Sequence, residues 1–286
     1  MLEQFLAYLR DIAKVSAHTL DAYKRDLEGW AAFCQQAYGF SPVENLESWQ
    51  KVQSYQVRAW LSLYPRGTTR ARKGAALRRM NTYIERVLRQ KGWTHRLASP
   101  KLPPALPRAL SERSLLPLIQ GLESRAISFP EVRNLLVAEL LYGCGLRRSE
   151  AANLRLGQVH LAAQELHILG KGSKWRIIPI YKPLLSLLQR YLALRKALQP
   201  DHDYLLCTDK GKPLYPQAIY RIVRGTLGTH PHALRHSFAT HLLQRGAHVQ
   251  AVKELLGHAS LATTQRYLAI TPAELKAAYQ KCHPRA

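Results

Sequence analysis

The stretch LASPKLPPALPRALS, residues 97–111, contains four prolines, at positions 100, 103, 104 and 107. Proline has no backbone N–H to donate, and it biases the preceding residue toward an extended conformation. A stretch of this composition is typical of a semi-rigid connector between two folded units. The sequence therefore predicts a first domain over residues 1–97, a linker over 98–110 and a second domain over 111–286.

The segment before the linker has apolar residues at helical spacing. Phe5, Leu9 and Ile12 predict a first helix, and Ser16 is placed to cap the start of a second. Residues 57–63 and 75–88 predict two more helices. The second helix carries a set of apolar residues on one face: Leu20, Tyr23, Leu27, Trp30 and Phe33. We therefore expect a wholly helical N-terminal domain.

The segment after the linker has a mixed pattern. Two strands, over residues 166–169 and 175–180, flank the sequence GKGSK, which is typical of a hairpin turn. Helices are predicted over residues 111–122, 130–142, 182–198 and 248–256, and from residues 217 and 231 onward. The predicted fold class is mainly α with a small antiparallel sheet, in which a helical N-terminal domain precedes an α+β domain.

The composition favours an anionic partner. The chain of 286 residues contains 42 Lys and Arg against 19 Asp and Glu, a formal net charge of +23. Such a surplus repels itself in the compact state, and the phosphates of nucleic acid offer a dense line of opposite charge. A membrane surface is another polyanion, but no stretch approaches the roughly 20 apolar residues of a spanning helix. A basic surface that binds nothing is the remaining alternative.

The positive charge is concentrated just before the linker. Residues 58–96 contain eleven Lys and Arg and one acidic residue, Glu85. A helix in this segment can bury its apolar side and present the other side to phosphates, although some of the basic side chains could be only solvated. The residues that we expect to contact nucleic acid are Arg70, Arg72, Lys73, Arg78 and Arg79.

The cysteines and the N-terminus indicate a cytoplasmic protein. The four cysteines are scattered, with no CxxC spacing, so we expect free thiols in a reducing compartment. The first residues, MLEQFL, lack the basic region and the apolar run of a secretory signal.

The sequence YGCGLRRSEAANL, residues 142–154, contains a first candidate site residue. Its two glycines predict a turn, and a helix is expected from about Leu146. On that helix Arg147 shares a face with Ala151 and Leu154 and points inward, whereas Arg148 points outward. A buried arginine needs a carboxylate or a bound anion as its partner. Glu150 could be that carboxylate, and both possibilities stay open.

The hairpin sequence GKGSK, residues 170–174, contains a second candidate. It does not fit the phosphate-binding pattern GxxxxGK[ST], so nucleotide binding is not expected. Glycines on both sides of Lys171 let the turn approach a ligand closely and direct the ammonium outward. A solvated basic turn is the alternative.

The sequence HPHALRHSFATH, residues 230–241, is rich in histidine. His232 and His236 have the i, i+4 spacing of a zinc pair, but no glutamate lies between them and Arg235 would repel a cation. We therefore expect no metal. His232 and Arg235, three residues apart on one helix face, could contact one phosphate, with His236 packed in the core.

The sequence LLGHASLATTQRY, residues 255–267, predicts two helices and a bend. Gly257 is placed to end the first helix, and Ser260 to cap the second. His258 falls in the bend, and Tyr267 lies two turns along the second helix. The chain has 14 tyrosines, so spacing alone does not distinguish Tyr267 from a structural tyrosine.

Taken in order, these motifs resemble those of the tyrosine site-specific recombinases, and in particular the bacterial Xer group. The resemblance covers nearly the whole chain, including the proline-rich linker and the closing HPRA. It implies that Tyr267 attacks a DNA phosphodiester, forms a 3′-phosphotyrosyl bond and frees a 5′-hydroxyl. No metal or cofactor is implied, so the protein's own cations must stabilise the charge on the phosphoryl oxygens.

The resemblance also assigns roles to the other motif residues. Arg147 and Arg235 would bind the phosphoryl oxygens, and Lys171 would protonate the leaving 5′-oxygen. His232 would assist proton transfer at the nucleophile, and His258 would donate a hydrogen bond to the phosphate.

The partners implied by the resemblance are a double-stranded recombination site and three further subunits. The tetramer would contain one recombinase or two, and it would resolve chromosome or plasmid dimers, with a DNA translocase such as FtsK as a possible trigger. A helix over residues 271–281 would dock on a neighbouring subunit or fold back on its own domain. The alternatives are an integrase of a mobile element, a type IB topoisomerase, or a DNA-binding regulator without cleavage activity.

Overall fold

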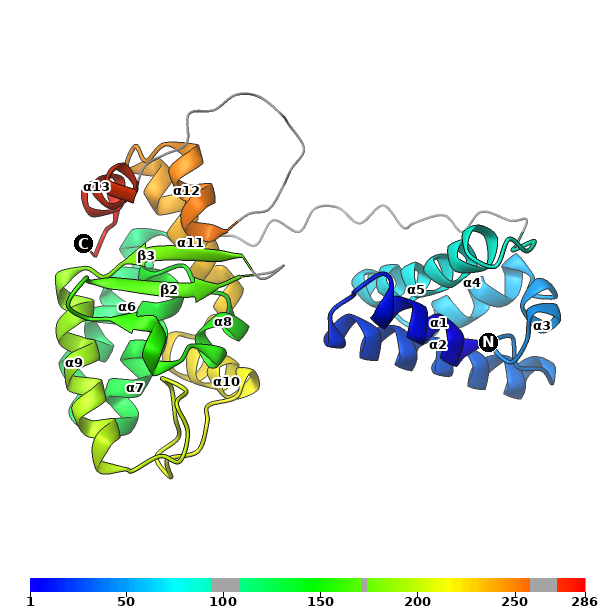
Figure 1. The fold of residues 1–286 in the computed structure, drawn as a ribbon, viewed down its shortest axis with the longest axis horizontal. Helices are drawn as coiled ribbons and strands as arrows, with labels where there is room; N and C mark the ends of the chain where they lie inside the picture. Colours follow the sequence, from blue (N-terminus) through cyan, green and yellow to red (C-terminus); the bar gives the residue numbers. More distant parts are fainter. Residues whose placement is uncertain (94–108, 171–173, 258–271, 286) are drawn as a thin grey trace. The chain divides into compact units, whose positions relative to one another are not determined.

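A computed structural model describes residues 1–93, 109–170, 174–257 and 272–285 of the chain. The chain divides into two compact units, Met1–Ala105 and Leu106–Ala286 (Figure 1). Apart from its last two positions, the linker predicted over residues 98–110 lies outside the described residues. The division between the units falls within that predicted linker.

The first unit is helical throughout its described part, which confirms the sequence prediction. Its elements are α1 (Leu2–Asp11), α2 (Ala17–Tyr38), α3 (Leu46–Gln50), α4 (Ser54–Ser62) and α5 (Gly67–Arg86). Ser16 caps α2 as predicted, because its hydroxyl accepts a hydrogen bond from the backbone N–H of Thr19. Helix α5 begins eight residues before the predicted position 75, and the short α3 was not predicted.

Aromatic side chains form the core of the first unit. Trp30, Trp49, Trp60 and Phe5 are almost completely buried there, and rings of this size contribute much of the apolar area that a small helical unit can bury. Ile12, predicted on the apolar face of the first helix, is 71% exposed. The prediction is wrong for Ile12, which is the C-terminal cap residue of α1.

The second unit combines helices with a small sheet, as predicted. Its helices are α6 (Glu112–Arg125), α7 (Phe129–Ala138), a π-helical turn η1 (Glu139–Gly143), α8 (Arg148–Asn153), a 3-10 turn η2 (Leu156–Gln158), α9 (Lys182–Ala197), α10 (Pro216–Leu227), α11 (Pro231–Gln244), α12 (Val249–Leu256) and α13 (Pro272–Cys282). The strands are β1 (Val159–His160), β2 (Glu165–Leu169) and β3 (Trp175–Pro179), in the antiparallel order β1-β2-β3. Of the three, only the two-residue β1 was not predicted.

Helix α7 is central to the packing of the second unit. It contacts α6, α9, α10 and the turn η1, and η1 in turn packs against α11. On the sheet side, β3 contacts α12 and α13 (Figure 1). These contacts bring the start of α8, the strand β3, the helix α11 and the end of α12 into one region of the unit.

Helix α13 packs on its own unit, against α11, α12 and β3. Tyr279 is completely buried and donates a hydrogen bond to the carbonyl of Gly143, at 2.5 Å. Beyond the helix, Arg285 forms an ion pair of 2.6 Å with the buried carboxylate of Glu139. The contacts of this helix in the single chain are with its own unit, and docking on a neighbouring subunit stays a prediction.

In the described part of the chain, no helix has the length and apolar content needed to span a membrane.

Candidate active site

Arg147 lies at the start of α8 and not within it. The helix begins at Arg148, and Glu150 accepts hydrogen bonds from the backbone N–H of Arg147 and from its Nη1, both at 2.7 Å. The predicted inward position on a helix is therefore wrong, because Arg147 precedes the helical repeat. Its side chain is 35% exposed, so a bound anion can reach it. Arg148 is exposed, as predicted.

Arg235 reaches the same region from α11. Its guanidinium is 8% exposed and donates hydrogen bonds to the carbonyls of Gly145 and Leu256, the latter at 2.6 Å. Gly145 has a φ of +61°, and a Cβ at this position would lie 2.5 Å from the ring of Phe238. Glycine is therefore required here, since a side chain would displace the turn that supports Arg235.

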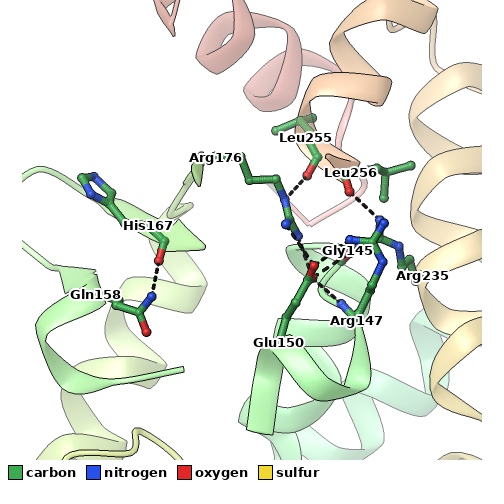
Figure 2. Close-up of polar contacts among 9 residues, drawn as sticks. All are labelled: Gly145, Arg147, Glu150, Gln158, His167, Arg176, Arg235, Leu255 and Leu256. Carbon is green, nitrogen blue, oxygen red and sulfur yellow. Dashed lines mark hydrogen bonds and ion pairs between the residues drawn. The ribbon is translucent and has the colours of Figure 1, made fainter. Parts of the chain in front are cut away.

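Glu150 is shared by three arginines, as Figure 2 shows. Arg176, on β3, donates from Nη2 to Oε2 at 2.7 Å and from Nη1 to Oε1 at 3.1 Å. Arg235 lies farther away, with Nη1 at 3.6 Å from Oε2. Burial raises the pKa of Glu150, but hydrogen bonds from Arg176 and Arg147 outweigh it and lower that pKa to about 2. The carboxylate therefore stays ionised at neutral pH.

The cluster has more positive than negative charge. Three guanidinium groups surround one carboxylate, so a positive surplus remains in a mostly buried place. Burial, and then the nearby charge of Arg147, lower the pKa of Arg235 to about 9, which still leaves it charged at neutral pH. An anion bound beside Arg147 and Arg235 would offset that surplus. The arrangement is suited to binding a phosphate.

His232 lies on α11, three residues before Arg235, and its side chain is exposed. The ring is still partly shielded from water, and this partial burial, followed by the charges of His230, Arg235 and neighbouring groups, lowers its pKa. The imidazole is therefore neutral at pH 7 and able to accept a proton.

The histidine predicted in the core is a different one. His236 is only partly buried, whereas His241 is 1% exposed. The ring of His241 lies 2.9 Å from the hydroxyl of Tyr142 and 2.8 Å from the carbonyl of Leu110. The prediction of His236 in the core was wrong because α11 turns the face of His241 inward.

Three proposed site residues, Lys171, His258 and Tyr267, lie outside the described residues. The residue directly before two of them, Lys171 and His258, is described. Gly170 donates its backbone N–H to the carbonyl of Lys174 at 2.8 Å, which closes the hairpin at the position just before Lys171. Gly257 ends α12 with a φ of +63°, as its sequence context predicted, and His258 follows it directly.

Arg176 is the site residue that sequence reasoning missed. On an alternating strand it shares a face with Ile178 and Ile180, which are buried. This alternation alone places a cation on the inward face, where it requires an acceptor. Among the described residues, no group of three or more His, Cys, Asp and Glu side chains could hold a metal ion.

The basic residues of α5 differ in their surroundings. Arg70 and Arg79 are exposed, and Arg78 is partly buried. Lys73 is buried: its ammonium lies 3.1 Å from Asp26 and 4.7 Å from the centre of the Trp60 ring.

Arg72 pairs with the same buried Asp26 through one guanidinium nitrogen and remains half-exposed. Lys73 therefore does not fit the predicted contact with phosphates, because its ammonium is buried and paired with Asp26. The spacing of charges along α5 does not reveal this, since Asp26 belongs to another helix, α2.

Comparisons with known proteins identify the family of the chain. Residues 109–274 match the phage integrase family, and residues 2–86 match the N-terminal SAM-like domain of phage integrases. A tyrosine recombinase XerC of Pseudomonas fluorescens is 37% identical over all of this chain and 96% of its own length.

Solved structures share the fold. The XerH site-specific recombinase, in a post-cleavage complex with a palindromic difH substrate, superposes with a TM-score of 0.67 at 23% identity, over 91% of this chain and 79% of that one. The Tn1549 transposon integrase superposes with a TM-score of 0.64 at 18% identity, over 98% of each chain. The chain therefore belongs to the phage integrase family. It is an enzyme of that family, a site-specific tyrosine recombinase of the Xer type.

Proposed function

We propose that this recombinase binds a double-stranded recombination site and cuts and rejoins it through a 3′-phosphotyrosyl intermediate at Tyr267. The observation that supports this most is the cluster at Glu150, in which Arg147 and Arg235 converge with a surplus of positive charge. Guanidinium groups bind phosphoryl oxygens through paired hydrogen bonds and remain charged during the reaction.

The proposed step balances without a cofactor. The phenol oxygen of Tyr267 forms a bond to phosphorus, and the bond from phosphorus to the 5′-oxygen breaks. His232, neutral at pH 7, takes the phenol proton, and the ammonium of Lys171 gives a proton to the leaving 5′-oxygen. Arg147, Arg235 and His258 stabilise the phosphoryl oxygens. A 5′-hydroxyl from another strand reverses the step and rejoins the DNA.

The first unit would hold the duplex through its phosphates. Arg70 and Arg79 on α5 are exposed and available for such contacts, and Arg72 and Arg78 would add to them. Phosphate contacts of this kind position a protein on DNA without reading the sequence of the bases.

The biological role that we propose is resolution of chromosome or plasmid dimers in the cytoplasm, and thereby chromosome segregation at cell division. Four subunits, of this recombinase alone or with a second one, would act on two duplexes, and a DNA translocase such as FtsK would trigger exchange. The XerC relatives that match the full length of the chain support this role over that of a mobile-element integrase.

A nicked duplex tests the proposal, because loss of the short strand beyond the nick prevents rejoining and traps the covalent complex. The duplex carries the core sequence that the protein selects from a random pool. We expect an SDS-stable adduct with the wild-type protein, and none with Tyr267→Phe at undiminished DNA binding. EDTA should leave the yield of adduct unchanged. Relaxation of supercoiled DNA without any specific site would support a type IB topoisomerase and contradict the proposal.

A further inference from the structure

Arg176 lies where three segments meet, and each segment leads to a proposed catalytic residue. Its own strand, β3, pairs with β2 so that Arg176 is opposite Ile168, and Leu169 is opposite Trp175. After Leu169 the chain continues through Gly170 to Lys171. Arg176 therefore lies one residue pair from the end of the described β2–β3 ladder, and Lys171 belongs in sequence to the segment that connects the two strands.

The first contact of Arg176 is with the segment that contains Arg147. Two hydrogen bonds, of 2.7 and 3.1 Å, join its guanidinium to the carboxylate of Glu150. Glu150 accepts two further hydrogen bonds from Arg147. The side chains of Arg176 and Glu150 are 8% and 6% exposed, so the pair is held in place by the surrounding protein.

The second contact is with the end of α12, which leads directly to His258. Nε of Arg176 donates a hydrogen bond of 2.8 Å to the carbonyl of Leu255 (Figure 2). A Cβ on Gly257 would lie 3.1 Å from Cδ of Arg176. The side chain of Arg176 thus passes closely beside the glycine that ends the helix. A cation at this end of a helix is also favoured by the helix dipole.

We propose that Arg176 is a positioning residue, which fixes the β2–β3 hairpin and the end of α12 against the Arg147–Glu150 pair and thereby sets Lys171 beside the 5′-oxygen that leaves. Arginine suits the task because its planar group offers several donors in fixed directions, two toward the carboxylate and one toward the carbonyl. A lysine at this place could not make all three bonds in the same geometry. The inference rests on the proposed function.

A leaving group that needs no acid provides a test. It separates a loss of rate caused by a misplaced Lys171 from a loss of rate with any other cause. An alkoxide needs a proton to leave, whereas a thiolate, with a thiol pKa of about 8.5, leaves without one. The test uses the nicked duplex described above, with either oxygen or sulfur at the bridging 5′ position. The measured quantity is the initial rate of adduct formation.

We expect Arg176→Lys to slow adduct formation on the oxygen duplex about 10- to 100-fold, the range seen when a supporting residue of a site is lost. On the sulfur duplex, the rate of Arg176→Lys should lie within about threefold of the wild-type rate on the same duplex, because the acid is no longer needed. Glu150 keeps its two hydrogen bonds from Arg147 in this variant, so the position of Arg147 is retained.

Two matched variants complete the experiment. Arg147→Lys should be slow on both duplexes, because its proposed contacts are with non-bridging oxygens. Arg155→Lys is the control, because it changes an exposed arginine of the same unit that pairs with Asp203. It should form the adduct at the wild-type rate on both duplexes.

Equal losses for Arg176→Lys on the two duplexes, or no loss on either, would contradict the proposal. If Arg176→Lys shows no cooperative unfolding transition, the proposal is also contradicted, because Arg176 would then be needed for folding and not for positioning Lys171. Wild-type protein that forms no adduct on either duplex would overturn the proposed function itself, so the two failures are distinguishable.

Discussion

Among the single residues of the site, Glu150 is central, because it is the one carboxylate among three arginines. Its carboxylate is nearly buried and accepts hydrogen bonds from Arg147 and Arg176, while Arg235 lies within 3.6 Å. A buried carboxylate is costly to desolvate, and here the surrounding guanidiniums compensate for that cost. The carboxylate holds the arginines near one another before DNA is bound. It also neutralises part of their positive charge.

Glu150→Gln should therefore destabilise the second unit. Without the negative charge the guanidiniums repel one another, and loss of one partner of a buried ion pair costs about 3 kcal/mol, or about 6–12 °C in the melting temperature. Sulfate should restore part of this loss, because it binds the folded cluster. Differential scanning calorimetry with and without sulfate measures both effects. The control, Glu165→Gln, changes a carboxylate that is 34% exposed. A variant as stable as the wild type would contradict the role given to Glu150.

A second prediction concerns His232 and pH. Burial and the positive groups around it, His230, Arg235, His236 and Arg147, lower its pKa from 6.5. The neutral ring, which accepts the phenol proton, therefore persists below pH 6.5, and the rate of cleavage should fall only as the pH drops through that lowered pKa. The pH profile of adduct formation measures this. In His232→Gln the acidic limb should disappear, and an acidic limb centred above pH 6.5 in the wild type would refute the assignment.

At the scale of elements, α5 contains two kinds of basic residue that the sequence alone does not distinguish. Arg79 faces solvent, whereas Lys73 pairs with Asp26 of α2 beneath the rings of Trp60 and Tyr64. The first kind is available to phosphates. The second serves the packing of the helices.

Substitution by alanine should separate the two kinds. Arg79→Ala should weaken binding to duplex DNA and reduce the slope of log affinity against log salt by about 1, with stability unchanged. Lys73→Ala should leave that slope unchanged but lower the stability of the first unit by about 2 kcal/mol, because Asp26 then keeps only Arg72. Salt titrations of binding, and urea unfolding followed by tryptophan fluorescence, measure the two effects. The reverse pattern would contradict this division.

The elements that could be predicted are those with local determinants. Ser16 caps α2 where the sequence places it, and Gly257 ends α12. The hairpin was predictable from its alternation and glycines. The two-residue strand β1 and the break of the helix after Ala138 into a π-helical turn were not, because both depend on packing with distant parts of the chain.

The same distinction applies to the site. The short spacing to Glu150 made it a candidate partner of Arg147, and the structure shows that contact. The burial of Lys73 and the three hydrogen bonds of Arg176 involve residues far away in the sequence. Local sequence patterns could identify the candidate catalytic residues, but not the residues that position them.

At the scale of the whole molecule, the net charge of +23 is the dominant property. Basic residues occur both on α5 of the first unit and in the cluster of the second. Binding to duplex DNA should therefore be steeply salt-dependent, because each neutralised phosphate releases counterions. For about 6–10 phosphate contacts, affinity should fall about 10³- to 10⁵-fold between about 50 and 200 mM salt. Fluorescence anisotropy with a labelled duplex measures this, and a flat response would contradict the role of the basic surplus.

In the proposed reaction, the cations at Glu150 bind one phosphate and Tyr267 attacks it. The most direct test is to trap the protein on the nicked duplex, digest the complex with protease and nuclease, and identify the nucleotide-bearing residue by mass spectrometry. We expect a nucleotide attached through its 3′-phosphate to the peptide that contains Tyr267, and to that residue alone. Attachment to another tyrosine, or through a 5′-phosphate, would contradict it.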